Sequence, residues 1–401
     1  MTPPPTDRVA QVSLLRPGRH LLPVLSFTLL ALNACRSHDF PQYPANYREY
    51  AYVTNGGSAT VTVLDVVNIR VDRELPVGPN PVAVIASPTL NEVYVVNSGA
   101  EKSDGSVSVI NAENNTVAAT IAVHRRPESI DLAADGSLAY VTNSGSNTVS
   151  VLDLKARREV AQIGVGDEPV SARISPDLKT LVVANRRANS ASIIDAATGK
   201  IRAVFTACPG AADVVILPDS TKAFIACAGG HQVMVIALAH SKFNPDQPDH
   251  LEALLDVGRA PVQLALKPDG GEVFVSNSLS DSISEIYAST DEVGGATMIG
   301  QDPVRALVST DNSLVYVANL QSQYVTVYAI EDGRVSDPAH PLHVGDGPSA
   351  MAFSSSGLLI FVVDSRSADV AVVRAASRSL FTMLPTGRAP NAIAIKSFKL
   401  P

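Results

Sequence analysis

Polar and charged side chains recur at equivalent positions within short apolar stretches, most of which open with a proline. Asp131, Arg173, Asp213, Gln263 and Arg305 hold these positions. A guanidinium group binds carboxylates and phosphates through paired hydrogen bonds, and a carboxylate can accept a proton or balance a nearby cation. These residues form either a hydrated structural network, whose charges compensate one another, or a ligand-binding wall. We favour the network, because a buried charge needs a partner or water whether or not a ligand binds.

Arginines also gather in the loops that connect these stretches to their neighbours. Arg125 and Arg126 lead directly into one stretch, and His231 stands in a comparable loop. Such cations could receive a carboxylate, a phosphate or an acidic polymer. Glu168 and Asp346 occupy equivalent loops and would offset much of the positive field, which favours an ordinary surface of mixed charge. A modest anion site is the most specific function that these residues support. The other loop arginines are Arg186, Arg187, Arg259, Arg366 and Arg388.

The composition excludes several classes of protein. The chain has 401 residues, a formal net charge of −8 and no lysine-rich block, which argues against a nucleic-acid binder. Hydrophobic residues make up 46% of the chain but aromatic residues only 5%. The apolar mass is therefore mostly Val, Ala, Leu and Ile, which suits many thin layers better than one bulky core. Three cysteines exclude both a disulfide-rich scaffold and a multi-cysteine metal cluster.

The elements that would position the candidate residues repeat at a nearly fixed period. An apolar triplet followed by Asn, as in residues 52–55 (YVTN), occurs six times, and two further copies end in Cys227 and Asp364. The spacings between the final residues of successive copies are 42, 46, 42, 42, 50, 42 and 45. Each unit contains four short stretches typical of β-strands, separated by turn residues. Four-stranded units of about 40 residues are blades of a β-propeller.

These motifs resemble the YVTN family of β-propeller repeats, which is found in bacterial and archaeal surface and exported proteins. The resemblance covers residues 51–398 and implies an all-β propeller. We name the proline-led strand A, the strand that carries the motif B, and the next two C and D. The chain begins at a B strand and ends after an A strand. We therefore expect eight blades in a ring closed by pairing of the C-terminal strand with the N-terminal blade. Seven blades, with one degenerate unit outside the ring, is the alternative.

Propeller geometry predicts where the candidate residues lie. Strand A is innermost, so the second and fourth residues after its proline are expected to line the central channel, while the first, third and fifth pack between sheets. The D–A and B–C loops share one face of the ring. The loop arginines and His231 are therefore expected around the channel mouth on that face.

Cys208 and Cys227 are expected to form a disulfide. Cys208 replaces the glycine that ends strand D in other units, and Cys227 replaces the Asn that ends strand B. Antiparallel pairing returns the end of strand B beside the start of strand A, so the two cysteines should be neighbours. If the protein is exported, the oxidising compartment would allow them to form a disulfide. The alternative is a pair of thiols that binds a metal together with His231. The spacing is not a standard zinc pattern, and we predict no metal site.

Residues 1–34 are typical of an export signal. Three arginines precede an apolar run, Leu21 to Leu32, which is too short to span a bilayer at about 20 residues per crossing. Residues 32–35 (LNAC) resemble a bacterial lipobox, which implies lipidation at Cys35; an ordinary signal peptide is the alternative. Residues 35–50 would then be a lipid-anchored tether and residues 51–401 the propeller domain. Because Arg36 follows the cysteine, the resemblance implies the outer membrane if the envelope has two membranes.

The leading functional hypothesis is an exported, lipid-anchored and monomeric binding module. Its partner would be a protein, a polymer or a small anionic ligand at the D–A/B–C face, with no cofactor, no nucleic acid and no membrane contact beyond the lipid. The alternative is an enzyme or cofactor-binding domain, because similar propellers include lactonases and the haem-binding domain of nitrite reductases. A lactonase would bring Glu128, Asp213, Arg305 and His231 together at the channel mouth. A haem site would take its axial ligand from His124 or His231.

Overall fold

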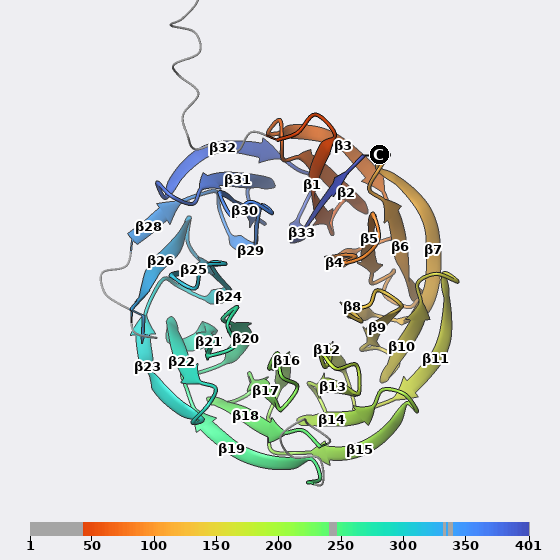
Figure 1. Cartoon of the computed structure of the whole chain (residues 1–401), viewed down its shortest axis with the longest axis vertical. Helices are drawn as coiled ribbons and strands as arrows, with labels where there is room; N and C mark the ends of the chain where they lie inside the picture. The colour runs from red at the N-terminus through yellow and green to blue at the C-terminus, as the bar shows by residue number, and fades with distance from the viewer. Residues whose placement is uncertain (1–42, 240–246, 332–333, 336–339, 401) are drawn as a thin grey trace, which may run out of the picture. The chain divides into compact units, whose positions relative to one another are not determined.

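Eight β-sheets stand around a central axis in the computed structural model, which describes residues 43–239, 247–331, 334–335 and 340–400. This arrangement, seen down the axis in Figure 1, confirms eight blades rather than seven. The predicted export signal, Cys35 and the first part of the tether lie outside the described residues. Within the described part, no helix has the length and apolar character needed to cross a membrane.

Blades 1 to 4 each take four strands that follow one another in the chain. From the inside of the ring outward they are β4 (Pro81–Ala86), β5 (Glu92–Asn97), β6 (Asp104–Asn111) and β7 (Thr116–Arg125); β8 (Pro127–Leu132), β9 (Leu138–Asn143), β10 (Thr148–Asp153) and β11 (Arg158–Gly164); β12 (Pro169–Ile174), β13 (Thr180–Asn185), β14 (Ser190–Asp195) and β15 (Lys200–Phe205); and β16 (Ala211–Ile216), β17 (Lys222–Cys227), β18 (Gln232–Ala237) and β19 (His250–Asp256).

Blades 5 to 8 repeat the pattern with two variations. The outer strand of blade 6 is divided into two short strands that both pair with β26, and blade 8 combines the two ends of the chain. The strands are β20 (Pro261–Leu266), β21 (Glu272–Asn277), β22 (Ser282–Tyr287) and β23 (Glu292–Met298); β24 (Pro303–Val308), β25 (Leu314–Asn319), β26 (Tyr324–Glu331), β27 (Arg334–Val335) and β28 (His340–His343); β29 (Pro348–Phe353), β30 (Leu359–Asp364), β31 (Asp369–Arg374) and β32 (Ser379–Pro385); and β33 (Pro390–Lys399), β1 (Tyr47–Asn55), β2 (Thr60–Asp65) and β3 (Arg70–Pro76). A 3₁₀ turn, η1 (Ser278–Ser280), follows β21.

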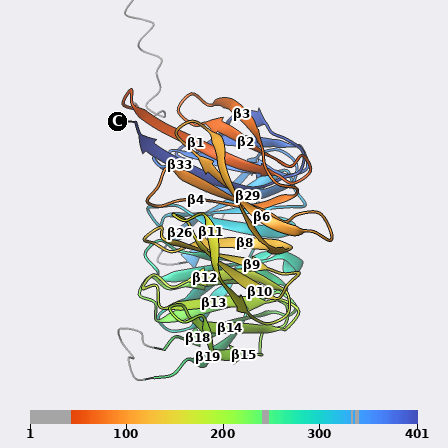
Figure 2. The ribbon, with the colours of Figure 1, turned by 90° about the vertical axis from the view of Figure 1, so that its right-hand side faces the viewer.

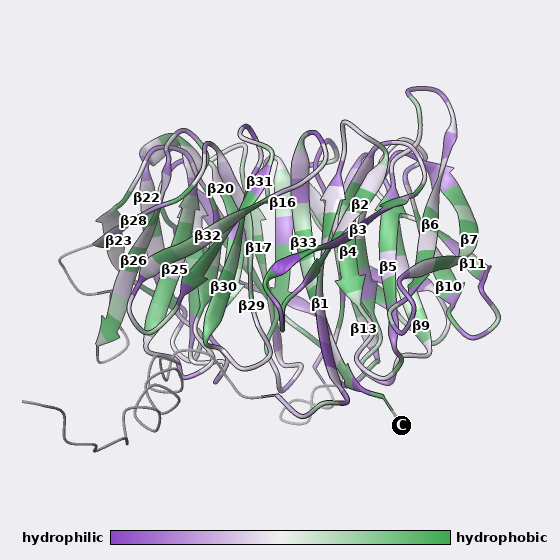
Figure 3. Cartoon of the chain, turned by 90° about the horizontal axis from the view of Figure 1, so that it is seen from above, coloured by the Kyte–Doolittle hydropathy of each residue, from purple (hydrophilic) through white to green (hydrophobic). Residues whose placement is uncertain are grey.

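Hydrophobic residues dominate the strands, and hydrophilic residues concentrate in the loops at both ends of the strands (Figure 3). Buried hydrophobic side chains of neighbouring blades form shared clusters. Tyr94 and Val107 of blade 1, for example, belong to one buried cluster with Val141 and Leu152 of blade 2. The first residue of the repeated motif supplies the largest of these side chains. In seven blades it is a buried aromatic residue: Tyr52, Tyr94, Tyr140, Phe224, Phe274, Tyr316 or Phe361.

The buried asparagine that ends the motif ties strands B and C together. The Nδ2 of Asn143 donates to the hydroxyl oxygens of Thr148 and Ser150, and the same arrangement recurs in most other blades. A glycine in the D–A loop packs closely against the side chain of this asparagine. A Cβ on Gly78 would come within 2.7 Å of Asn97, which explains why the glycine accompanies the asparagine.

Blade 4 replaces this glycine–asparagine contact with a covalent bond. Cys208 and Cys227 form a disulfide with their Cα atoms 4.9 Å apart, and both residues are fully buried. The predicted disulfide is therefore confirmed. Because both thiols are consumed in the bond, the alternative of a metal site on free thiols does not hold.

Blade 7 carries aspartate where the motif has asparagine. The carboxyl group of Asp364 is fully buried, accepts a hydrogen bond from the backbone N–H of Gly345 at 3.0 Å, and lies beside the carboxyl group of Asp369. Burial, with the nearby charge of Asp369, raises the pKa of Asp364 to about 8. The two carboxyl groups thus hold a proton at neutral pH that ordinary aspartates would have released.

The ring closes where the two ends of the described chain meet. β33 pairs antiparallel with β1 from Tyr47↔Lys399 to Asn55↔Pro390, and the two strands lie side by side in Figures 1 and 2. This confirms the predicted closure of the ring by its C-terminal strand. Lys396 adds a contact across the boundary to blade 1, because its buried Nζ donates to the carbonyl oxygen of Ser87 at 2.8 Å.

The first strand begins earlier than the sequence suggested. β1 starts at Tyr47, four residues before the expected start of the propeller at residue 51, so residues 47–50 belong to a blade and not to the tether. The physical reason is the length of β33, which continues to Lys399 and supplies backbone partners as far as Tyr47. Asn46 and Leu400 extend this contact with two further hydrogen bonds, each 2.9 Å long.

Candidate functional site

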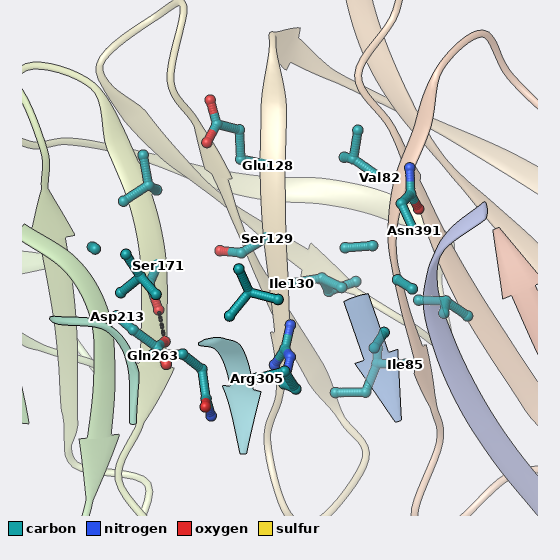
Figure 4. Close-up of a pocket in the computed structure, with 18 of the residues that line it drawn as sticks. Val82, Ile85, Glu128, Ser129, Ile130, Ser171, Asp213, Gln263, Arg305 and Asn391 are labelled. Atoms are coloured by element: carbon teal, nitrogen blue, oxygen red, sulfur yellow. Dashed lines mark hydrogen bonds between the residues drawn. The ribbon is translucent and has the colours of Figure 1, made fainter. Parts of the chain in front are cut away.

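A cavity of about 390 Å³ opens between the innermost strands, and the A strands of all eight blades contribute to its wall (Figure 4). Arg173, Asp213, Gln263 and Arg305 line this cavity, so the structure brings together four of the eight predicted binding residues. Arg125, Arg126, Asp131 and His231 lie elsewhere. The volume falls near the lower end of the usual range for small-molecule sites.

Asp213 and Gln263 hold neighbouring blades together. Strand A is the free inner edge of each sheet, so some of its backbone N–H groups find no partner within the blade. Asp213 accepts the N–H of Leu264 in the next blade at 3.1 Å and the hydroxyl of Ser171 in the preceding blade at 3.1 Å. Gln263 accepts the N–H of Ala306 in blade 6 at 2.7 Å. Both side chains therefore have a structural role.

Asp131 makes the same kind of contact two positions further along its strand. Its Oδ2 accepts the N–H of Ile174 at 2.9 Å, and its Oδ1 lies 3.6 Å from Nη1 of Arg173. Asp131 lines a second cavity of about 320 Å³ instead of the first, while Arg173 lines both. The Asp131–Arg173 ion pair thus stands where the two cavities approach each other.

Arg305 is the exception among the charged residues of the cavity. Within the described part of the chain, its guanidinium group makes no hydrogen bond and no ion pair, although the side chain projects into the cavity and is accessible to solvent. The protein atoms around it displace water, and together with the charge of Arg173 they lower the pKa of Arg305, while Asp213 opposes this shift. Arg305 stays protonated, because arginine begins from a very high pKa. The cavity therefore contains a cation with unused hydrogen-bond donors.

At the D–A/B–C end of the cavity, arginines and acids neutralise one another. Glu128 lies 3.6 Å from Arg126 and 3.7 Å from Arg186, and Arg186 also lies 3.3 Å from Glu168. Arg366 pairs with an aspartate, Asp346, in the same way at 3.6 Å. Neither Arg125 nor Arg126 reaches the cavity wall. This end of the molecule has the mixed charge that the loop sequences suggest.

The histidines lie away from the cavity. His231 is 60% exposed and sits 3.5 Å from the carboxylate of Asp256, while His124 contacts Glu159 at 3.2 Å between the outer strands β7 and β11. Neither residue lines the cavity. The residues that line it therefore do not fit a haem group with a histidine ligand, and a lactonase site would lack the histidine that we expected.

The first residue after the proline was expected only between sheets, but in several blades it also lines the cavity. Val82, Glu128, Val262 and Asn391 occupy that position and line the cavity. Strand A is an edge strand, so both of its faces border the channel. Asn391 was missed for this reason, although a polar residue at a position that four other blades fill with valine was the available signal.

The described residues contain no group of three or more His, Cys, Asp or Glu side chains that could hold a metal ion. What the cavity offers is one uncommitted guanidinium group, several hydroxyl and amide groups already engaged in hydrogen bonds, and apolar surface.

The repeats match those of known propellers. Residues 78–204 match the family model described as YNCE-like beta-propeller. This segment contains the motif copies that end in Asn97, Asn143 and Asn185. The chain carries β-propeller repeats of the YVTN type. Over 98 residues the propeller is 34% identical to the "Uncharacterized protein YncE" of Salmonella typhi, a match that covers 24% of this chain and 26% of the relative. It thus spans about a quarter of the length of this curated relative.

Solved structures share the fold at low sequence identity. The propeller is similar to the dihydro-heme d1 dehydrogenase NirN in complex with DHE, with a TM-score of 0.69, 18% identity, and coverage of 88% of this chain and 76% of that one. It is also similar to the periplasmic gluconolactonase PpgL of Pseudomonas aeruginosa, with a TM-score of 0.58, 17% identity, and coverage of 88% and 99%. At these identities the likeness establishes the fold alone.

Proposed function

We propose that the propeller is a non-catalytic binding module that takes a small anionic ligand into the central cavity at Arg305. The observation that carries this proposal is the guanidinium group of Arg305, which faces the cavity without a hydrogen bond or ion pair within the described part of the chain. The other charges nearby are already engaged: Glu128 contacts Arg126 and Arg186, and Arg173 contacts Asp131. An entering anion would find Arg305 free.

The surroundings of Arg305 strengthen this binding mode. A cation that neighbouring protein has partly desolvated interacts more strongly with an anion than a cation in open water does. The planar guanidinium group can present two parallel N–H donors to a carboxylate or phosphate. The size of the cavity, about 390 Å³, suits a small molecule better than a protein segment or a polymer. Of the three ligand classes that the sequence suggested, the cavity therefore favours the small anionic ligand.

Isothermal titration calorimetry at low ionic strength tests the proposal. The probes are inorganic phosphate, sulfate and butyrate, added to the purified full-length protein and to the variant Arg305→Gln. Because a hydrogen bond to a charged group contributes about 1.5–3 kcal/mol, we expect this variant to bind at least ten-fold more weakly. The matched control is Arg187→Gln, an exposed loop arginine outside the cavity. Equal affinities in the wild type and in Arg305→Gln, or no binding of any probe, would refute the proposal.

A hydrolase is the second candidate, and the shared cavity wall is the observation in its favour. Glu128, Asp213 and Arg305 line one cavity, and one structural neighbour is named a gluconolactonase. Asp213 would act as the base and Arg305 would stabilise the oxyanion. Hydrolysis of a sugar lactone that Asp213→Asn and Arg305→Gln both abolish, in variants whose circular dichroism is unchanged, would favour this candidate over simple binding.

Export and anchoring through Cys35 remain part of the proposal. The apolar run that ends at this cysteine supports it, as does the buried disulfide, since disulfides persist in oxidising compartments. Metabolic labelling with a palmitate analogue should mark the wild-type protein in the membrane fraction. The variant Cys35→Ser should carry no label. Light scattering on the purified protein tests the expected monomer.

A further inference from the structure

The wall of the central cavity has two unlike halves. Blades 2 to 6 contribute its charged and hydrogen-bonding side chains, among them Ser171, Asp213 and Arg305, whereas blades 7, 8 and 1 contribute mainly hydrocarbon. In Figure 4, Ser171, Asp213 and Gln263 stand on one side and Val82 and Ile85 on the other. The apolar half consists of Val82, Ala83, Val84, Ile85, Ala350, Met351, Ala392 and Ile393.

One polar residue interrupts the apolar half, but its amide group is already engaged. Asn391 accepts the hydroxyl of Thr54 at 2.6 Å and donates its Nδ2 to the carbonyl oxygen of Pro81 at 2.9 Å. Val82 and Ile85 beside it are only partly buried, so their hydrocarbon surface faces the cavity. Water in contact with this surface would be released by an apolar ligand, and this release favours binding.

The polar half has few hydrogen-bonding groups left for a ligand. Ser129 shares a hydrogen bond with Thr142 at 2.8 Å, and Ser171 donates to Asp213 at 3.1 Å. Gln263 donates to the carbonyl oxygen of Leu264 at 2.7 Å and accepts from Ala306. A sugar acid needs a partner for each of its hydroxyl groups, and these side chains would have to break existing bonds to supply them. Arg305 alone offers its full set of donors.

Arg305 stands where the two halves meet, because blade 6 is the neighbour of blade 7 in the ring. We propose that the cavity selects an organic monocarboxylate with an apolar hydrocarbon body. Its carboxylate binds Arg305, and its hydrocarbon body lies against the wall formed by blades 7, 8 and 1. This inference rests on the proposed anion site at Arg305 and adds the chemistry of the rest of the ligand.

A series of unbranched carboxylates tests the inference. Acetate, butyrate and hexanoate are titrated into the full-length protein at pH 7 and low ionic strength. Inorganic phosphate serves as an anion without a hydrocarbon chain. Burial of one methylene group strengthens binding by about four-fold, so the two additional methylene groups of hexanoate should raise its affinity roughly 16-fold over that of butyrate. We expect Arg305→Gln to weaken every carboxylate by a similar factor while the dependence on chain length remains.

The apolar wall is tested with the double variant Val82→Thr/Ala392→Ser, which keeps side-chain size almost unchanged. This variant should bind acetate as the wild type does but lose most of the gain from butyrate to hexanoate. The control is Leu90→Thr, a change at a residue of the same blade that is 41% exposed and lies outside this cavity. Circular dichroism confirms that each variant is folded before titration.

The possible results separate this inference from the proposal on which it rests. If phosphate binds through Arg305 as tightly as hexanoate does, the anion site stands and the apolar ligand class is wrong. If the chain-length dependence survives in Val82→Thr/Ala392→Ser, the hydrocarbon body does not lie on this wall and the inference is likewise wrong. If no probe depends on Arg305, both proposals fail.

Discussion

The buried aspartate of blade 7 gives a quantitative prediction: Asp364→Asn should stabilise the propeller, and increasingly so as the pH rises. Because the folded state raises the pKa of Asp364 from 3.8 to about 8, it holds a proton that the unfolded chain releases. The contribution of Asp364 to stability is therefore fully present below pH 4 and is lost as the pH rises towards 8, by about 1.4 kcal/mol per pH unit. Asparagine does not titrate and avoids this loss.

The expected gain from Asp364→Asn follows from the two pKa values. At pH 7 it reaches roughly 4 kcal/mol, and at pH 5 roughly 2 kcal/mol. The asparagine also restores the residue found in six other blades, and its Nδ2 can donate to Asp369. The assay is urea denaturation of the wild type and the variant at both pH values, followed by circular dichroism.

A second variant separates burial from the effect of the neighbouring charge. Asp369→Thr removes the second carboxyl group and should give a smaller gain than Asp364→Asn, because burial is the leading cause of the shift. A gain from Asp364→Asn that is the same at pH 5 and pH 7, or no gain at either, would show that Asp364 is ionised in the folded protein and that the reasoning is wrong.

Three further changes, the last with a matched control, test the architecture. Deleting residues 392–401 should abolish cooperative thermal unfolding, since the ring loses most of its closing strand; a sharp transition at an unchanged temperature would contradict this. The double variant Cys208→Ala/Cys227→Ala should unfold about 3 kcal/mol more easily in urea, and a reductant should affect only the wild type. Gly78→Ala should cost about 1–3 kcal/mol, because its Cβ would press against the motif asparagine. Gly164→Ala, whose Cβ would meet nothing within 4 Å, should leave stability unchanged.

The fold could be predicted because every blade carries the same local signals. The nearly constant repeat length indicated the blades, and the order in which strand types begin and end the chain indicated eight of them in a closed ring. The disulfide followed from the same regularity, since Cys208 and Cys227 replace two residues that meet in other blades. The blades and the disulfide depend on contacts between segments close in sequence, and the ring closure depends on the order of the strand types; sequence spacing specifies both.

The site was less predictable because its contacts connect different blades. Alternation along strand A placed Arg305 in the channel, but it did not show that Asp213 would bind the backbone of Leu264, a residue 51 positions away. His231 illustrates a second limit. Its loop lies on the expected face of the ring, yet it joins β17 to β18, the second and third strands from the axis, so His231 does not line the cavity.

The blade that combines strands from both ends of the chain limits how such a protein can gain or lose blades. Loss of β1 or of β33 removes a strand from this blade and opens the ring. Duplication or loss of an internal stretch of about 42 residues would instead add or remove one complete blade, wherever the stretch begins, and would leave the join between β33 and β1 untouched. Gene rearrangements inside the reading frame can therefore vary the width of the central hole, while the ends of the gene stay constant.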